Sequence, residues 1–448
     1  MHAVYHTTKH WPFFARDVMK KSLSVYLALA IVSLFLWFEF GVGPVVIRPF
    51  DGLLFIGLGG ALAVASMQGK IKNLYIADFQ WVYLALTTYV IVNGLVFSGA
   101  GAAFKELLQK SEYVFLMLAI GALTRHPRRR RLFVWTLVIG CALAAIATAG
   151  WHVANGHLVD YKRLSELKLV FGLFAYFMVA YLVVSSGTPA LGLVGGLGAF
   201  YLMLLSGERK GWLAFAAGIA FLYIAMRRRS ILKSLLRGHL SLKGVVLVAV
   251  VLAGGVLVGS GSSSGYVVGQ IQTLSDMWSS LEGRGIQFRQ GQSLSNQVRL
   301  FLLQFTIETV KAHPWWGIGV GEFKEAIQFA APGEMFVKGA HSEYQRYAVE
   351  TGLTGLGLYL LTWALMIRRA WRVVRRTDLA KQTETALVVG LVVYGAVINL
   401  FLGGGALNIL FLVLPAGLLQ GILNEEKQRA SRHAFRHDAS APGATVPA

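Results

Sequence analysis

The chain has 448 residues, of which 55% are hydrophobic and only 14% are charged. Because soluble domains carry about a quarter charged residues, this composition excludes an ordinary soluble globular protein. The net charge of +20 does not indicate nucleic-acid binding, because no basic patch lies on a plausible soluble domain. Apolar runs of about 20 residues instead predict an all-α polytopic membrane protein.

In chain order, about twelve such runs alternate with short polar or basic turns, which predicts about twelve transmembrane helices. Their approximate centres are Ala30, Gly59, Thr87, Leu118, Cys141, Phe177, Leu197, Gly218, Val251, Tyr359, Leu391 and Val413. We therefore divide the chain into transmembrane helices 1–9 with short loops, one large loop, transmembrane helices 10–12 and a disordered tail. These four parts cover residues 1–260, 261–340, 341–424 and 425–448.

Basic residues cluster in particular turns, at 125–131, 227–237 and 368–381. Since cytoplasmic turns of membrane proteins are enriched in Lys and Arg, the pattern predicts that these turns and both termini are cytoplasmic. The same alternation predicts that four other segments lie outside, namely 99–112, 151–168, 206–210 and 261–340. Arginines in the outer segments need a different explanation, and three of them stand out: Arg163, Arg209 and Arg299.

The large loop contains one predicted helix, from Asn296 to Lys311. Its apolar residues recur at helical spacing and would share one face: Val298, Phe301, Leu302, Phe305 and Val310. Such a helix could lie along the membrane interface or against the bundle. The pair His313-Pro314 and the glycines that follow end it, and we expect a long loop from there to Ala340.

His341 comes just before the tenth predicted span, at the outer membrane surface. Imidazole titrates near neutral pH, so this histidine is a candidate general base. The alternative is a histidine that packs at the interface without chemistry. The only cysteine, Cys141, lies in an apolar run, so no disulfide within the chain is possible.

Arg209 lies in a short turn between two spans, and Arg299 lies on the amphipathic helix. A guanidinium group presents a fork of donors that suits phosphate oxygens. Alternatively, each arginine reaches lipid headgroups or pairs with a nearby carboxylate, Glu208 or Glu308. Arg163, between other basic residues, is a weaker candidate. The outer carboxylates show no metal-ligand spacing, so no metal site is predicted.

These residues resemble a known family. The run His341-Ser342, nine residues, Gly352, two residues, Gly355 resembles the signature of bacterial O-antigen ligases. Arg299 followed by His-Pro-Trp-Trp-Gly-Ile-Gly-Val-Gly at 313–321 is similar to a second segment of that superfamily. The turn Ser-Gly-Glu-Arg at 206–209 is similar to its short turn before a membrane helix.

The resemblance implies a membrane-embedded glycosyltransferase of the GT-C-like fold in the bacterial inner membrane, acting on the periplasmic side. The enzyme would transfer a polysaccharide from undecaprenyl-diphosphate-linked O-antigen to a hydroxyl of the lipid A-core oligosaccharide, without metal or other cofactor. His341 would be the general base, Arg209 and Arg299 would bind the diphosphate, and Arg163 would assist. Its partners would be these two substrates and membrane lipids.

Three other functions remain open. An O-antigen polymerase of this superfamily tends to have two sizeable outer loops, whereas one is predicted here. A protein O-oligosaccharyltransferase tends to be longer, with an added outer region at its C-terminus. A transporter of the lipid-linked glycan would need ionisable residues near the middle of its spans, and the predicted span interiors are largely uncharged.

Overall fold

The computed structural model describes residues 11–33, 40–42, 45–47, 76–154, 168–184, 209–226, 294–330, 342–376, 382–402 and 408–439. Within these ranges the chain is mostly helical. Two short strands, β1 (Phe40–Val42) and β2 (Val45–Ile47), pair antiparallel, with Gly41 opposite Val46.

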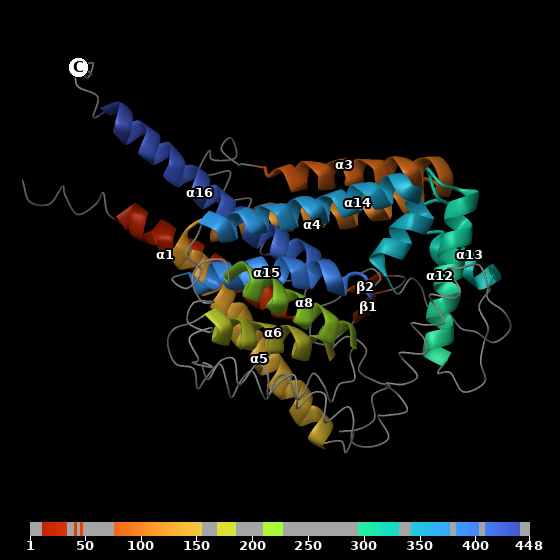
Figure 1. Cartoon of the computed structure of the whole chain (residues 1–448), viewed down its shortest axis with the longest axis horizontal. Helices are drawn as coiled ribbons and strands as arrows, with labels where there is room; N and C mark the ends of the chain where they lie inside the picture. The colour runs from red at the N-terminus through yellow and green to blue at the C-terminus, as the bar shows by residue number, and fades with distance from the viewer. Residues whose placement is uncertain are drawn as a thin grey trace, which may run out of the picture.

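The long helices pack together as a bundle (Figure 1). They are α1 (Trp11–Val32), α3 (Asp78–Asn93), α4 (Ala100–Thr124), α5 (Pro127–Ala154), α6 (Lys168–Val184), α8 (Arg209–Met226), α14 (Glu343–Arg376), α15 (Thr383–Ile398) and α16 (Leu414–Ala439). Two π-helical turns extend them, η3 (Gly94–Ser98) after α3 and η7 (Ile409–Val413) before α16.

Five of the described helices are long and apolar enough to cross a membrane: Asp78–Ser98, Ala100–Thr124, Pro127–Ala147, Glu343–Arg376 and Ile409–Ser431. Three shorter apolar helices accompany them. The predicted all-α membrane protein is thereby confirmed. The count of about twelve spans stays a prediction, and the centres Gly59, Leu197 and Val251 lie outside the described residues.

The centre of the bundle is α15, whose side chains are almost all buried. A helix that is apolar on every side is stable only when other helices surround it, and α15 packs against α6, α8 and α16. Small residues bring the backbones close: a Cβ on Gly218 of α8 would lie 3.2 Å from the carbonyl oxygen of Gly390. The hydroxyl of Tyr176 donates to the Leu387 carbonyl at 2.6 Å.

One end of the bundle, which we call the basic end, carries arginine–carboxylate pairs. Arg369 near the end of α14 donates to Asp78 at the start of α3 at 2.7 Å. Arg130 near the start of α5 donates to Glu425 of α16 at 2.8 Å. The described parts of the predicted basic turns, residues 125–131 and 368–376, therefore meet at one end.

The structure differs from three expectations about irregular segments. The segment 99–112, expected as an outer turn, is helical because α4 begins at Ala100. The tail, expected to be disordered from residue 425, is helical to Ala439. The first turn of this tail is stabilised by Glu425, which binds Arg130 and pairs with Arg429, four residues further along the helix. The loop expected after residue 313 contains a further helix, α13 (Phe323–Ala330).

Candidate functional site

The end of the bundle opposite the basic end is covered by α12 (Leu294–Ala312) and α13 (Figure 1), and we call it the α12 end. These helices share a small core with α14, made of Leu302, Phe323, Ile327 and Val349. The predicted apolar face of α12 packs against it. The helix ends at Ala312, directly before His313-Pro314, as predicted. Its partner is therefore protein, from α13 and α14.

Arg299 projects from α12 with an exposed side chain. No hydrogen bond or ion pair holds its guanidinium among the residues that the structure describes. Glu308, the predicted alternative partner, instead accepts a hydrogen bond from Gln304 at 2.7 Å. The guanidinium is thus available to a ligand with phosphate oxygens.

The turn from Pro314 to Gly321 docks onto a kink in α14 by exchanging backbone partners. In a regular helix the Val349 carbonyl would accept from the amide of Leu353, four residues on. Here the Leu353 amide donates to the Pro314 carbonyl at 2.7 Å, and the Val349 carbonyl accepts from Ile318 at 2.9 Å. The turn therefore satisfies the backbone groups that the kink removes from α14.

Glycine is required on both sides of this contact. Gly352 forms the kink with φ 66° and ψ −166°, a region that favours glycine. A Cβ there would lie 2.5 Å from the carbonyl carbon of Trp315. In the turn, Gly317 has φ 69°, and its Cβ would lie 2.5 Å from the carbonyl carbon of Glu350. The glycines of two separated motifs thus allow one close backbone contact.

Helix α3 supports the same turn from its other side. The Tyr89 hydroxyl lies 3.0 Å from the Trp315 carbonyl oxygen and 3.1 Å from that of Thr351. The Asn93 amide donates to the Trp316 carbonyl at 2.7 Å. Both tryptophan side chains are largely exposed, which is typical of aromatic residues at a membrane–water interface.

A buried charge cluster joins α4 to the first turns of α14, and the sequence analysis missed it. We define it as Glu106 and Lys110 of α4 with Glu343, Arg346 and Glu350 of α14. The Arg346 guanidinium lies 3.2 Å from Glu350, 3.4 Å from Glu106 and 3.7 Å from Glu343. Lys110 lies 3.6 Å from Glu106.

Aromatic rings enclose the cluster. Lys110 donates to the Tyr347 hydroxyl at 3.0 Å and lies over the rings of Tyr347 and Tyr113, at 5.3 and 5.4 Å from their centroids. Tyr347 stacks in turn on Tyr359, with the centroids 4.5 Å apart. Burial of charges among apolar groups costs several kcal/mol for each ion unless they are closely paired. The buried charges therefore lower the free energy of unfolding at this end unless they are closely paired.

The start of α14 is anchored to the end of α15. The Glu343 amide lies 2.7 Å from the Leu402 carbonyl oxygen and 3.2 Å from that of Asn399. Ser342 is buried, and its hydroxyl accepts from the Gln345 amide at 3.4 Å as a helix cap. The first turn of α14 is thus fixed on two sides, by α15 and by the charge cluster.

Of the predicted site residues, His341 and Arg163 lie outside the described residues. Arg209, predicted to lie in a short turn between two spans, is the first residue of α8. Near its other end, α8 places Phe221 against Trp371 of α14, with ring centroids 5.6 Å apart, close to the basic end. Because a helix rises about 1.5 Å per residue, Arg209 lies roughly 18 Å further toward the α12 end.

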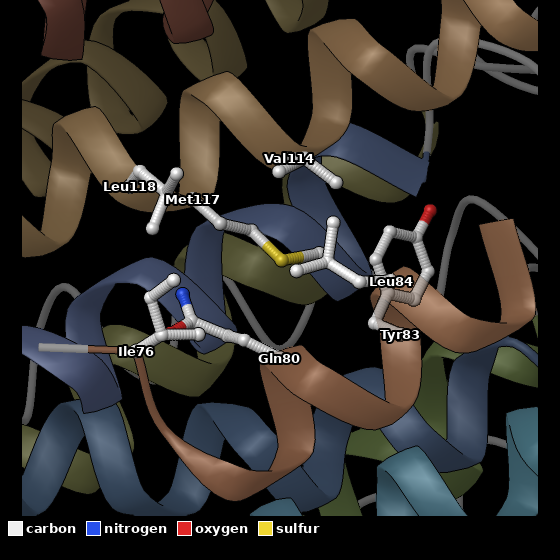
Figure 2. Close-up of a pocket in the computed structure, with 7 residues that line it drawn as sticks. All are labelled: Ile76, Gln80, Tyr83, Leu84, Val114, Met117 and Leu118. Atoms are coloured by element: carbon white, nitrogen blue, oxygen red, sulfur yellow. The ribbon is translucent and has the colours of Figure 1, made fainter. Parts of the chain in front are cut away.

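An apolar pocket lies between α3 and α4 (Figure 2). Its lining is Ile76, Gln80, Tyr83, Leu84, Val114, Met117 and Leu118. The side-chain amide of Gln80 donates to the Gln420 oxygen of α16. No charged residue is among those that line the pocket. Across the described ranges, no three His, Cys, Asp or Glu side chains form a metal site. Metal independence stays a prediction of the resemblance.

Residues 191–360 match the family model described as O-Antigen ligase. None of the curated proteins compared with the chain matches it. The matched range contains Arg209, Arg299 and His341, together with the docked turn and the kink at Gly352, whereas Arg163 precedes it. The resemblance drawn from the motifs is confirmed.

Proposed function

We propose that the chain, whose residues 191–360 match the O-antigen ligase family model, transfers a polysaccharide from undecaprenyl diphosphate to a sugar hydroxyl of lipid A-core. The match implies a glycosyltransferase-like membrane enzyme in the broad sense. The main support for the proposal is that two motifs far apart in the sequence are in contact in the structure. The turn after Arg299 docks at the Gly352 kink, in the helix that starts two residues after His341.

In this proposal His341 accepts the proton of the acceptor hydroxyl. The acceptor oxygen then bonds to the anomeric carbon of the donor sugar, and the bond from that carbon to the diphosphate breaks. Arg209 and Arg299 bind the diphosphate and stabilise its negative charge as it leaves, and Arg163 assists. The exposed, unpaired guanidinium of Arg299 supports this role. The reaction needs no ATP, because the diphosphate–sugar bond supplies the driving force.

We place the reaction on the periplasmic side of the bacterial inner membrane. The argument is the charge asymmetry of the bundle, since arginine-rich turns favour the cytoplasmic side. Residues 125–131 and 368–376 of these turns meet at the basic end, together with α16. The N- and C-termini are then cytoplasmic, and the α12 end with its candidate residues faces the periplasm, where the large loop belongs.

An in-vitro transfer assay tests the proposal. Purified protein is mixed with undecaprenyl-diphosphate-linked glycan and lipid A-core, with and without a chelator. We expect lipid A-core to shift to higher mass in both conditions. His341→Ala should abolish the shift, whereas His313→Ala, which removes an exposed histidine just before the docked turn, should retain it.

Each other outcome identifies a rival function. Longer lipid-linked chains without modified lipid A-core would make the protein a polymerase, and a glycan attached to a protein acceptor would make it an oligosaccharyltransferase. No change in any substrate, with movement of the glycan across vesicles, would make it a transporter. Activity lost with chelator and restored by Mg²⁺ would overturn the arginine-only account.

A further inference from the structure

The tip of the hairpin formed by α3 and α4 is uncharged and exposed. Between Asp78 and Lys105 the chain contains no charged residue. Where the hairpin reverses direction, four large apolar side chains have exposed fractions of 48% to 66%: Leu95, Val96, Phe97 and Phe104. A contiguous apolar surface of this kind marks contact with a membrane or a partner, and both helices are long and apolar enough to cross a membrane. The tip of the hairpin therefore contacts lipid.

The docked turn, Pro314–Gly321, lies alongside the helices of the bundle and not beyond their ends. On α3 it contacts Tyr89, nine residues before the end of η3 at Ser98. On α14 it contacts the kink at Gly352, nine residues after the helix begins at Glu343. Since a helix rises about 1.5 Å per residue, the turn lies roughly 13 Å inside the ends of both helices. It therefore reaches the depth at which the hairpin contacts lipid.

The backbone of the docked turn has the hydrogen bonds that a segment at this depth requires. In a bilayer, non-helical backbone is tolerated only where protein or enclosed water satisfies its polar groups. The carbonyl oxygens of Pro314, Trp315 and Trp316 lie 2.7 to 3.0 Å from donors on α14 or α3. The next three amides donate to carbonyl groups just before the turn or on α14, at 2.9 to 3.2 Å. A turn in water would not need these partners, because solvent would serve the same groups.

The two tryptophan side chains of the docked turn are exposed although its backbone is paired with the protein. The exposed fraction is 64% for Trp315 and 53% for Trp316. The Trp316 ring stacks on Tyr89 of α3 and contacts Phe97 of η3, with ring centroids 5.7 and 6.5 Å apart. The exposed indole therefore continues the apolar surface of the hairpin tip. An indole joins a large apolar ring to one N–H donor, which suits the boundary between acyl chains and headgroups.

We infer that the docked turn is a re-entrant segment in the membrane leaflet at the α12 end, where Trp315 and Trp316 contact the acyl chains and headgroups of lipids. The partner is lipid because the exposed indoles continue the lipid-contacting surface of α3 and η3. The helices before and after the turn, α12 and α13, lie at the same end of the bundle (Figure 1). The turn thus anchors α12, which carries Arg299, at the membrane surface. This placement holds whatever reaction the protein catalyses.

Quenching of tryptophan fluorescence measures the depth of the two indoles. Wild-type protein and the double variant Trp315→Phe/Trp316→Phe are reconstituted in phosphatidylcholine vesicles, and the difference between their emission spectra belongs to the two indoles. We expect this difference signal to lose most of its intensity when the lipids carry bromine on the acyl carbons nearest the headgroup. The loss should be much smaller with bromine at the chain ends, or with acrylamide in the aqueous phase.

Trp363→Phe is the matched control, because the Trp363 side chain of α14 is only 3% exposed, inside the bundle. Its difference signal should resist every quencher. If the double variant does not fold, Trp315→Phe alone serves, since the Trp315 ring stacks on no other aromatic ring of the described residues.

Two results would overturn the inference. Quenching by acrylamide but by no brominated lipid would show that the turn lies in water. The same quenching, relieved by a free oligosaccharide, would show that the indoles stack on sugar rings and not on lipid. The measurement needs no transfer of glycan, so a failure of the proposed function leaves its result unchanged.

Discussion

The charged side chains at the two ends of the bundle are paired in different ways. At the basic end, arginines meet carboxylates in closely bonded pairs, as in Arg130–Glu425 and Arg369–Asp78. At the α12 end, three carboxylates share Arg346 and Lys110, and Arg299 has no carboxylate partner among the described residues. Paired charges hold helices together. A guanidinium without a carboxylate partner, such as that of Arg299, is available to the phosphate oxygens of a ligand.

The largest effect expected is on stability, from Arg346→Met. This change removes the cation that Glu106, Glu343 and Glu350 share, so we expect a loss of about 3 to 5 kcal/mol in the free energy of unfolding. The matching change at the basic end, Arg130→Met, leaves Glu425 paired with Arg429 and should cost about 1 to 2 kcal/mol. Denaturation of the purified proteins in detergent measures both. Equal losses would erase the distinction between the two ends.

A second test concerns the kink. Gly352→Ala forces a side chain into a positive φ and against the Trp315 backbone, which should cost about 2 to 4 kcal/mol and displace the docked turn. The control is Gly357→Ala in the same helix, where a Cβ meets no atom within 4 Å. It should be neutral or stabilising by roughly 0.5 to 1 kcal/mol. Retained transfer activity in the first variant would show that docking is dispensable.

The third test separates binding from folding at the α12 end. Arg299→Lys keeps the positive charge but loses the fork of donors, so the transfer rate should fall about tenfold, with stability unchanged. Lys311→Gln removes an exposed charge from the last turn of the same helix and should leave the rate alone. A wild-type rate for Arg299→Lys would indicate that Arg299 only reaches headgroups.

The smallest effect belongs to the basic end. Asp78→Asn weakens the contact with Arg369, but both side chains are partly exposed. Partly exposed ion pairs contribute less than about 1 kcal/mol. We expect a slightly lower unfolding temperature and an unchanged rate of transfer. A loss of transfer would mean that charge at this end also serves the reaction.

Local patterns predicted the parts of the fold that depend on few neighbours. The apolar spacing of Val298, Phe301 and Leu302 predicted α12 and its buried face, and His313-Pro314 predicted where it ends. The helix over 323–330 was missed because it is short and flanked by glycines, although its apolar face is strong. The helix α8 begins at Arg209, inside the turn that was predicted at 206–210.

The charge cluster could be anticipated only in part. Glu343, Arg346 and Glu350 are spaced three and four residues apart, which places them on one helical face. That spacing indicated a charged helical face, and these residues come shortly after His341 in the sequence. Their partner Glu106 lies 240 residues from Arg346 in sequence, in a segment expected as a turn. Such a long-range pairing depends on how α4 packs against α14, which no local pattern encodes.

The exchange of backbone hydrogen bonds between the Pro314–Gly321 turn and α14 also restricts where two related proteins can be joined in a chimera. The turn and the kink occupy different stretches of chain, yet each completes the other's backbone hydrogen bonds. A chimera with a junction between residues 321 and 342 would join a turn from one parent to a kink from another. Such junctions preserve both motifs in the sequence but not the fit between them, so we expect these chimeras to be less stable than either parent.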